Sequence, residues 1–237
     1  MEEIGRIQIL KYAVNYAVRS KGEIYLVNDG TKIKLAVLEY NRYAAMIVNG
    51  GHWPDFFDKS IVVKIGHPKK IVKTKSDLVD IIFINNVVAE INGEEVAYKL
   101  TDEVDLSFTE RFKDTPSLDY PIKGLLAVRA IDTFPILVSY DAGSNRFTFE
   151  RAWYVRGNDK RFRMSIDLYP NNDKTVFMDS PFAMSSLNTG ILNEVLNTIS
   201  ELHKEYPFDD IEISFYNLLL KLEFVGCEFY IVGREEV

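Results

Sequence analysis

The chain has 237 residues, of which 47% are apolar and 13% aromatic, and its formal net charge at pH 7 is −7. This composition can bury a core in one large or two small domains, and it excludes a disordered chain. No apolar stretch approaches the roughly 20 residues of a membrane-spanning helix, and the acidic start does not suit a secretory leader, so we expect an intracellular protein, cytoplasmic in a prokaryote or archaeon, with no membrane partner.

The first hundred residues predict a helix followed by strands and hairpins. A helix is expected over 7–19, with one polar stripe formed by Gln8, Lys11, Asn15 and Arg19. Branched and aromatic runs predict strands at 23–27, 32–38, 44–48, 60–65, 78–84, 87–91 and 95–100, with turns at 28–30, 49–51 and 92–93. A short second helix is predicted to begin near His67–Pro68, with Lys69, Lys70 and Lys73 on one face.

The second half repeats this order of elements. Residues 101–117 are polar and charged and contain a proline, which predicts a connector. A short helix at 122–131 and strands at 136–140, 146–152 and 161–168 follow, then a helix at 186–204 and strands at 210–215, 218–224 and 227–232. We therefore expect an α+β fold with an N-terminal domain at 1–102, a connector at 103–118 and a C-terminal domain at 119–237.

Positive charge is concentrated against the acidic total. Residues Lys59 to Lys75 carry six lysines and no carboxylate, and Ile4 to Lys21 adds four more cations without an acid. The two windows together hold +10, so the rest of the chain holds −17. A single lysine run most often only keeps a surface soluble, but two such windows indicate a polyanion that binds one face.

The repeat, the acidic total and the basic helices together resemble a DNA sliding clamp of the proliferating cell nuclear antigen type. Residues 185–199 resemble the last helix of this family, and 211–215, 218–224 and 228–234 resemble its last three strands. Ile231-Val232-Gly233-Arg234 stands where the family ends in Leu-Ala-Pro-Lys/Arg, and Leu38-Glu39-Tyr40-Asn41-Arg42 stands where it has Met/Leu-Asp-x-x-His. The N-terminus is short, which suggests that the first strand of the family is missing or reduced.

The resemblance implies two similar clamp domains, each with two helices packed on antiparallel sheets, that assemble into a three-subunit ring around duplex DNA. Such a ring is a processivity factor without catalytic activity or cofactor, and basic side chains in it contact phosphates without reading sequence. Five residues are the preferred DNA contacts: Lys11, Arg19, Lys69, Lys70 and Lys73. Weaker candidates are Arg6, Lys75, Lys123, Arg129 and Lys204.

The resemblance also implies a pocket for a short peptide motif of DNA polymerase and other replication enzymes, and a clamp loader as a further partner. The matching positions here are Leu38, Arg42, Leu219, Tyr230 and Val232, together with the connector. Ordinary core packing explains each of these residues equally well. The ring could contain one kind of subunit or include sister subunits.

Signals for catalysis or metal binding are weak. His52, His67 and His203 are scattered, the lone Cys227 excludes a cysteine metal site, and Asp209–Asp210 with Glu212 reads as an exposed strand edge. No phosphate loop or nucleophile motif occurs. Two alternatives to the clamp remain: a nucleic-acid-binding regulator that uses Lys59–Lys75 without forming a ring, and an enzyme with an unrecognised site.

Overall fold

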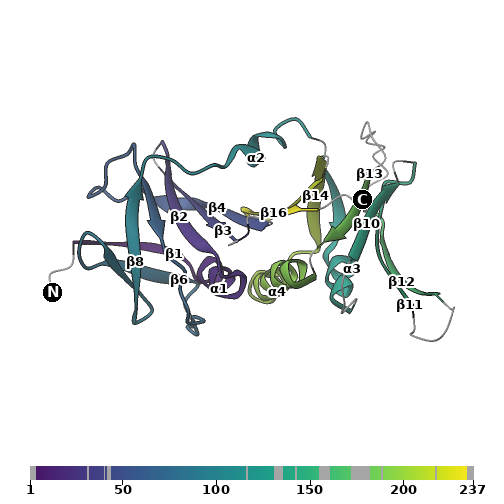
Figure 1. The fold of residues 1–237 in the computed structure, drawn as a ribbon, viewed down its shortest axis with the longest axis horizontal. Coiled ribbons are helices and arrows are strands. Elements are labelled where there is room, and N and C mark those ends of the chain that lie inside the picture. Colours follow the sequence, from purple (N-terminus) through teal and green to yellow (C-terminus); the bar gives the residue numbers. More distant parts are fainter. Residues whose placement is uncertain are drawn as a thin grey trace. The chain divides into compact units, whose positions relative to one another are not determined.

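The computed structural model describes residues 4–30, 32–39, 41, 44–115, 117–130, 136–141, 143–154, 161–171, 182–187, 189–216 and 218–233. It is an α+β protein with antiparallel sheets and few helices, which confirms the predicted class (Figure 1). The chain forms two compact units: unit 1 contains Met1–Ser107 and Val225–Phe229, and unit 2 contains Phe108–Phe224 and Tyr230–Val237.

Unit 1 is a curved antiparallel sheet with one α-helix among its described residues. Its elements are β1 (Gly5–Leu10), α1 (Lys11–Ser20), β2 (Glu23–Asp29), β3 (Lys32–Leu38), β4 (Ala44–His52), β5 (Val62–Ile65), β6 (Leu78–Phe83), β7 (Val88–Ile91) and β8 (Glu94–Thr101). The strands follow the order β1-β6-β7-β8-β5-β2-β3-β4. The predicted strands of the first half are thus confirmed, with shifts of a few residues at their ends.

The start of the first predicted helix is wrong. Residues from Ile7 to Leu10 belong to β1, which pairs antiparallel with β6 so that Ile7 lies opposite Ile81. Ile7 and Ile9 are buried while Arg6 and Gln8 are exposed, so the burial alternates with the period of a strand. The first strand, expected to be missing or reduced, is therefore present, and α1 begins at Lys11.

Of two turns predicted in unit 1 from asparagine and glycine, one is present and the other is not. Asn92 and Gly93 have φ of 51° and 72° and join β7 to β8, as predicted for a tight hairpin. The turn predicted at 49–51 is wrong, because these residues continue β4. The β3–β4 register shifts between Lys32 and Lys34, so the glycines there accommodate an irregular strand rather than a reversal of the chain.

Aromatic side chains fill much of the interior of unit 1. The ring of Phe83 lies 5.0 Å from that of Phe57 and 4.9 Å from that of Tyr98, both in edge-to-face geometry. Trp53 is buried beside them and donates its Nε1–H to the Phe57 carbonyl at 3.2 Å. Trp53 thus packs under a turn, and this cluster joins β6, β8 and the loop after β4 into one core.

In its described ranges, unit 2 contains a four-stranded sheet, a further set of antiparallel strands and two α-helices beyond the connector. Its elements are β9 (Ser117–Pro121), α3 (Ile122–Ala127) with a 3₁₀ turn at Val128–Ala130, β10 (Ile136–Asp141), β11 (Arg146–Tyr154), β12 (Arg161–Leu168), β13 (Phe182–Leu187), α4 (Thr189–Glu205), β14 (Asp210–Tyr216) and β15 (Leu219–Phe224). The four-stranded sheet has the order β12-β11-β10-β13, and β14 pairs with both β9 and β15. The last strand of the chain is β16 (Cys227–Val232).

Two strands of unit 2, β9 and β13, were not predicted. β9 lies partly inside the expected connector, and its sequence SLDYP has only two apolar residues before a proline. The pairing with β14, which begins more than ninety residues later, makes it a strand. Tyr120 of β9 is buried and donates its hydroxyl proton to the Asn145 carbonyl at 2.7 Å, and burial raises the pKa of that hydroxyl.

The expected repeat of helix, strands, helix and strands holds for unit 2 only. Unit 1 has α1 but no helix in its described residues between β5 and β6, where the second one was predicted. A four-residue helix, α2 (Ser107–Glu110), lies in the connector instead. None of the helices in the described ranges combines the length and the apolar character needed to cross a membrane.

Cys227 provides a direct test of how β16 is buried. Its thiol is 2% exposed, and burial raises its pKa to about 11. At pH 8 only about one thiol in a thousand is then ionised, and the thiolate is the reactive form. We expect an aromatic disulfide reagent to label the native protein at least about a hundredfold more slowly than the urea-unfolded chain. Equal labelling rates would show that β16 is not packed in this way.

Candidate nucleic-acid interface

The lysine segment, residues Lys69–Lys75, is an irregular loop and not the predicted helix. It lies between β5 and β6, where residues 66–77 form no helix or strand. Ile71, Val72 and Thr74 are β-branched and disfavour helix, and so short a helix would gain little against its cost of nucleation. The backbone groups of the segment instead bond to side chains from α1 and β8.

The centre of the lysine segment is bound to Asn15 of α1. The Val72 N–H donates to Asn15 Oδ1 at 2.7 Å, and Asn15 Nδ2–H donates to the Val72 carbonyl at 3.3 Å. Asn15 is 6% exposed and Val72 is 4% exposed. One amide side chain therefore satisfies both backbone groups of a buried residue that belongs to no sheet or helix.

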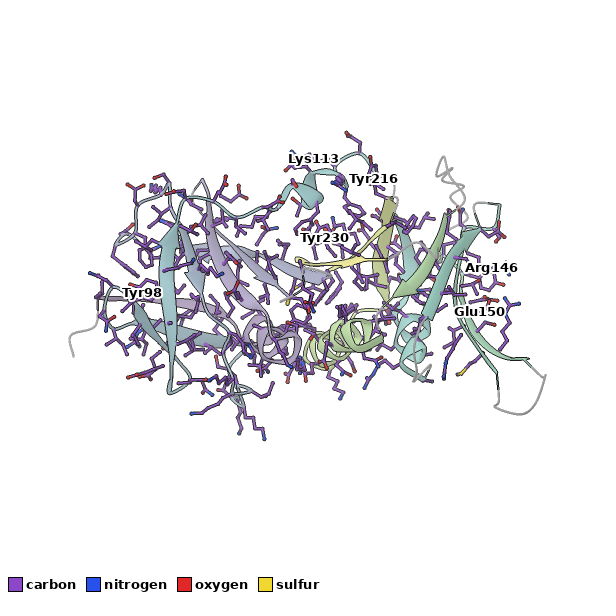
Figure 2. All side chains as sticks on the ribbon, viewed as in Figure 1. Tyr98, Lys113, Arg146, Glu150, Tyr216 and Tyr230 are labelled. Carbon is purple, nitrogen blue, oxygen red and sulfur yellow. The ribbon has the colours of Figure 1, made fainter. Side chains whose placement is uncertain are left out.

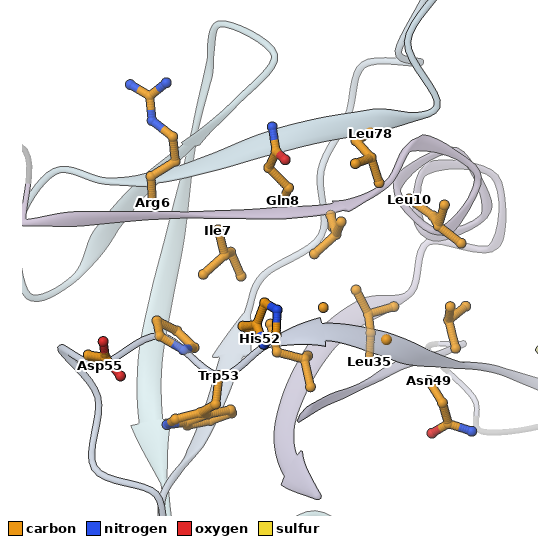
Figure 3. Close-up of a pocket in the computed structure, with 16 residues that line it drawn as sticks. Arg6, Ile7, Gln8, Leu10, Leu35, Asn49, His52, Trp53, Asp55 and Leu78 are labelled. Atoms are coloured by element: carbon orange, nitrogen blue, oxygen red, sulfur yellow. The ribbon is translucent and has the colours of Figure 1, made fainter. Parts of the chain in front are cut away.

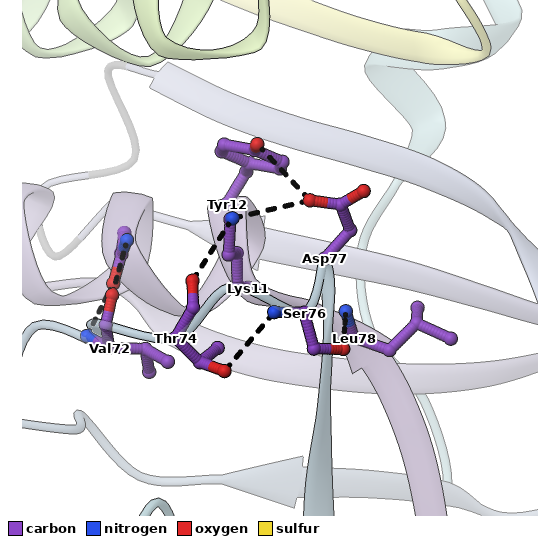
Figure 4. A network of polar contacts seen from close by, with 8 residues as sticks. Lys11, Tyr12, Val72, Thr74, Ser76, Asp77 and Leu78 are labelled. Carbon is purple, nitrogen blue, oxygen red and sulfur yellow. Dashed lines mark hydrogen bonds and ion pairs between the residues drawn. The ribbon is translucent and has the colours of Figure 1, made fainter. Parts of the chain in front are cut away.

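Lys11 holds the end of the lysine segment from the preceding turn of α1. Its Nζ lies 3.4 Å from the Thr74 carbonyl and 3.2 Å from Asp77 Oδ1 (Figure 4). The Tyr12 hydroxyl also donates to Asp77 Oδ1, at 3.5 Å. Lys11 is only 7% exposed and already paired with a carboxylate, so it is less available to a phosphate than the exposed lysines of the segment.

Glu94, at the start of β8, binds the beginning of the lysine segment. Its carboxylate accepts hydrogen bonds from the backbone N–H of Lys69 at 3.1 Å and from that of Lys70 at 3.0 Å. A carboxylate that binds backbone N–H groups fixes the chain without neutralising a lysine side chain by direct contact. The beginning, the centre and the end of the segment are each held by a side chain from elsewhere in unit 1.

The four lysines of the segment face solvent. Lys69, Lys70, Lys73 and Lys75 are all exposed. Within the part of the chain that the structure describes, none of their ammonium groups forms an ion pair with a carboxylate. They form a compact group of four positive charges on a fixed backbone, which suits an anionic polymer.

The other cations predicted in unit 1 are less available. Arg6 lies on β1 and pairs with Asp80 of β6 at 3.2 Å. Arg19 lies in the last turn of α1 and is partly buried. Arg19 follows Lys11 and Asn15 along one helix face at four-residue spacing, and the first two of these residues bind the lysine segment.

Unit 2 carries its predicted cations on helices. Lys123 is exposed in α3, Arg129 in the 3₁₀ turn that follows, and Lys204 in the last turn of α4. The helix α4 also contains Glu194 and Glu201. The cations of this unit are thus more dispersed than the lysine segment of unit 1.

The residues predicted to bind a partner peptide are mainly interior. Leu38, Leu219 and Tyr230 are buried and Val232 is partly buried, whereas Arg42 lies outside the described residues. In unit 2 the rings of Phe108 and Phe112 lie 5.0 Å and 5.5 Å from that of Tyr230. The connector therefore packs on Tyr230, and the more exposed Tyr216 lies near the same place (Figure 2).

A pocket of about 550 Å³ lies in unit 1 between β1 and the end of β4 (Figure 3). Its walls are largely apolar, with Ile7, Ile9, Leu35 and Trp53 among them. Its lining contains no hydroxyl, thiol or amine side chain, and its titratable side chains are Arg6, His52 and Asp55. No group of three or more histidine, cysteine, aspartate or glutamate side chains within the described ranges could hold a metal ion.

No family model and no curated protein matches this sequence. Solved structures do match, over nearly the whole chain. DNA polymerase III subunit beta from Borrelia burgdorferi matches with a TM-score of 0.61 at 13% identity, over 100% of this chain and 64% of that one. The beta sliding clamp of C. crescentus matches with a TM-score of 0.59 at 12% identity, over 99% of this chain and 67% of that one. The DNA polymerase sliding clamp from Bacillus subtilis matches with a TM-score of 0.60 at 12% identity, over 98% of this chain and 65% of that one.

The chain has a sliding-clamp fold. This confirms the predicted resemblance at the level of the fold, whereas the specific likeness to proliferating cell nuclear antigen stays a prediction. The chain spans about two thirds of the length of these clamps.

Sequence reasoning missed the residues that hold the lysine segment. Of Asn15 and Lys11, which share one predicted polar stripe, Lys11 alone is predicted to contact DNA. Glu94 is not among the predicted site residues. One signal was present: four-residue spacing puts Lys11 and Asn15 on one helix face, and an amide can bind the backbone of a segment that lacks a regular partner.

Proposed function

We propose that this chain is a non-catalytic subunit of a ring-shaped sliding clamp, which encircles duplex DNA without sequence preference and recruits replication and repair enzymes. The match of the whole chain to sliding clamps carries this proposal. The fold by itself does not specify a function, so the exposed lysine segment provides the local support.

The lysine segment supplies the principal DNA contact of the proposed clamp. Its four lysines are exposed and fixed in place, and no base-reading amide or carboxamide accompanies them on the exposed side of the loop. Lysine contacts to phosphates attract any duplex and weaken with salt, which a sliding protein requires. The remaining proposed contacts are Arg6, Arg19, Lys123, Arg129 and Lys204, and Lys11 is withdrawn from this set.

We further propose that three copies close the ring. This chain spans about two thirds of the length of the matched beta-clamp chains. Three copies of this chain therefore equal two beta-clamp chains in total length. The same count follows from the six-domain ring that the resemblance implies. Sister subunits in place of identical copies would satisfy the same geometry.

The proposed docking site for a polymerase peptide includes the connector and the aromatic residues beneath it. Tyr216 is 41% exposed, next to Phe112 of the connector, so an incoming apolar side chain would find a partly open aromatic surface there. Leu219, Tyr230 and Val232 would support this surface from β15 and β16, and Leu38 with Arg42 belongs to the site that the resemblance implies.

Two measurements test the clamp. Light scattering or mass photometry of the protein, alone and with candidate sister subunits and loader, is expected to show a species of three subunits, which for identical copies is about 82 kDa from a chain mass of 27.3 kDa. After loading, the protein should remain on nicked circular or end-blocked DNA and leave linear DNA within the same time.

A strict monomer under all of these conditions, with no difference between circular and linear DNA, would refute the ring. Tight binding to a short duplex or single strand, with a preference for sequence or structure, would instead support the regulator that uses the lysine segment without encircling DNA.

A further inference from the structure

We infer that Asn15 is a positioning residue of the DNA interface: it holds the lysine segment in one conformation before DNA arrives. The effect of Asn15 on DNA binding rests on the proposed function. Its effect on the conformation of the segment is independent of that function. Asn15 lies on α1, and its partner Val72 is 57 residues away in the sequence.

The contact is suited to this role by its place and its chemistry. Val72 lies between Lys70 and Lys73, so both of its backbone groups belong to the centre of the lysine segment. Asn15 bonds to both groups in a region almost closed to water. Without the amide, the buried N–H and the buried carbonyl of Val72 would each lose a hydrogen-bond partner. Movement of the segment outward into water would then lower the free energy, because water would bind both groups.

The two flanking contacts involve charged side chains. Glu94 binds the backbone at Lys69 and Lys70, and Lys11 binds the backbone at Thr74 and the carboxylate of Asp77. Ions weaken charged contacts that are partly exposed, as the one at Glu94 is, more than they weaken a buried amide pair. At the salt concentrations where DNA binding is tested, the contact of Asn15 with the centre of the segment is thus weakened less by salt than the charged contact of Glu94.

A fixed segment favours DNA binding without adding charge. Four long side chains on a mobile loop would have to lose backbone freedom when they meet phosphates, and that ordering would reduce the affinity. Because the backbone of the segment is already ordered in the folded protein, this entropy is lost during folding and not during DNA binding. Loss of Asn15 should therefore lower affinity while the number of phosphate contacts, and hence the salt dependence, changes little.

Hydrogen exchange and DNA retention together test the inference on the full-length chain. In Asn15→Ala, the Val72 amide is expected to exchange about tenfold faster, while amides in β2 and β3 keep their protection and show that unit 1 is folded. Retention on nicked circular DNA is expected to shorten about three- to tenfold. The slope of log affinity against log salt should change by less than about one, because all four lysines remain.

Asn15→Asp is the second variant, of nearly the same size. Its carboxylate still accepts from the Val72 N–H but cannot donate to the carbonyl, so we expect Val72 protection and DNA retention between those of the wild type and Asn15→Ala. An unchanged Val72 exchange rate in both variants would overturn the positioning role, whatever happens on DNA. Faster exchange with unchanged retention would overturn its part in DNA binding.

If the wild-type protein itself is not retained on circular DNA, the proposed function fails, and the DNA part of this inference fails with it. The exchange rate of Val72 then still decides whether Asn15 holds the segment, so the two failures are distinguishable.

Discussion

Replacement of Lys69, Lys70, Lys73 and Lys75 together by alanine is expected to remove most of the affinity of the protein for DNA. Each lysine that neutralises a phosphate contributes about 0.9 to the slope of log affinity against log salt on duplex DNA. Loss of all four should therefore reduce the slope by about 3 to 4 for each subunit. Binding to nicked circular DNA, measured between about 50 and 200 mM salt, gives both the affinity and the slope.

A matched variant separates the position of these lysines from their charge. Lys32, Lys59, Lys99 and Lys113 are also exposed, and their replacement by alanine changes the net charge from −7 to −11, as the first variant does. We expect this control to change the slope by less than about one. Equal slopes for the two variants would show that the lysine segment does not face phosphates and would remove the main local support for the clamp.

Phe83→Ala is expected to have the largest effect on stability. Phe83 is fully buried in β6, and its ring lies within about 5.5 Å of the rings of Phe56, Phe57 and Tyr98. Its loss removes buried apolar area and leaves a cavity, because rings held from three directions cannot collapse into the space. Such substitutions cost about 3 to 5 kcal/mol.

Urea unfolding followed by Trp53 fluorescence measures this loss in unit 1, since Trp53 is buried beside Phe57. Trp153→Phe, introduced into the wild type and into the Phe83→Ala variant, leaves Trp53 as the single tryptophan. The fluorescence then reports the unfolding of unit 1 alone, so it is not necessary to assume that both units unfold together. Val87→Ala is the control, because Val87 is 59% exposed and should cost less than about 0.5 kcal/mol. A loss below about 1 kcal/mol for Phe83→Ala would contradict a closed aromatic core.

The strands could be predicted from the sequence because each carries its own pattern. The bounds of β3, β12 and β16 agree with the predicted ranges, and the Asn92–Gly93 turn has the positive φ values that this pair favours. In contrast, β9 is short and poor in apolar residues, and it is a strand because β14 pairs with it. Pairing between distant segments leaves no local pattern when one partner is this short.

The candidate interface could be predicted only in part. The excess of lysine between Lys59 and Lys75 and the absence of carboxylates there are facts of the sequence, and they correctly indicated an exposed basic surface. The predicted helical conformation of that surface is wrong. Lys11 and Asn15 face inward because their hydrogen-bonding groups satisfy a loop that begins more than fifty residues later.

The sequence by itself determined the α+β class, most of the strands and the concentration of positive charge, since these depend on the period of apolar residues and on composition. The tertiary structure alone decided that residues 66–77 form an irregular loop, that Lys11 is paired with Asp77, and that Asn15 and Glu94 hold the backbone of the lysine segment. The physical reason is that a short segment with weak helical preference takes the conformation in which its buried backbone groups find partners, and here α1 and β8 supply those partners.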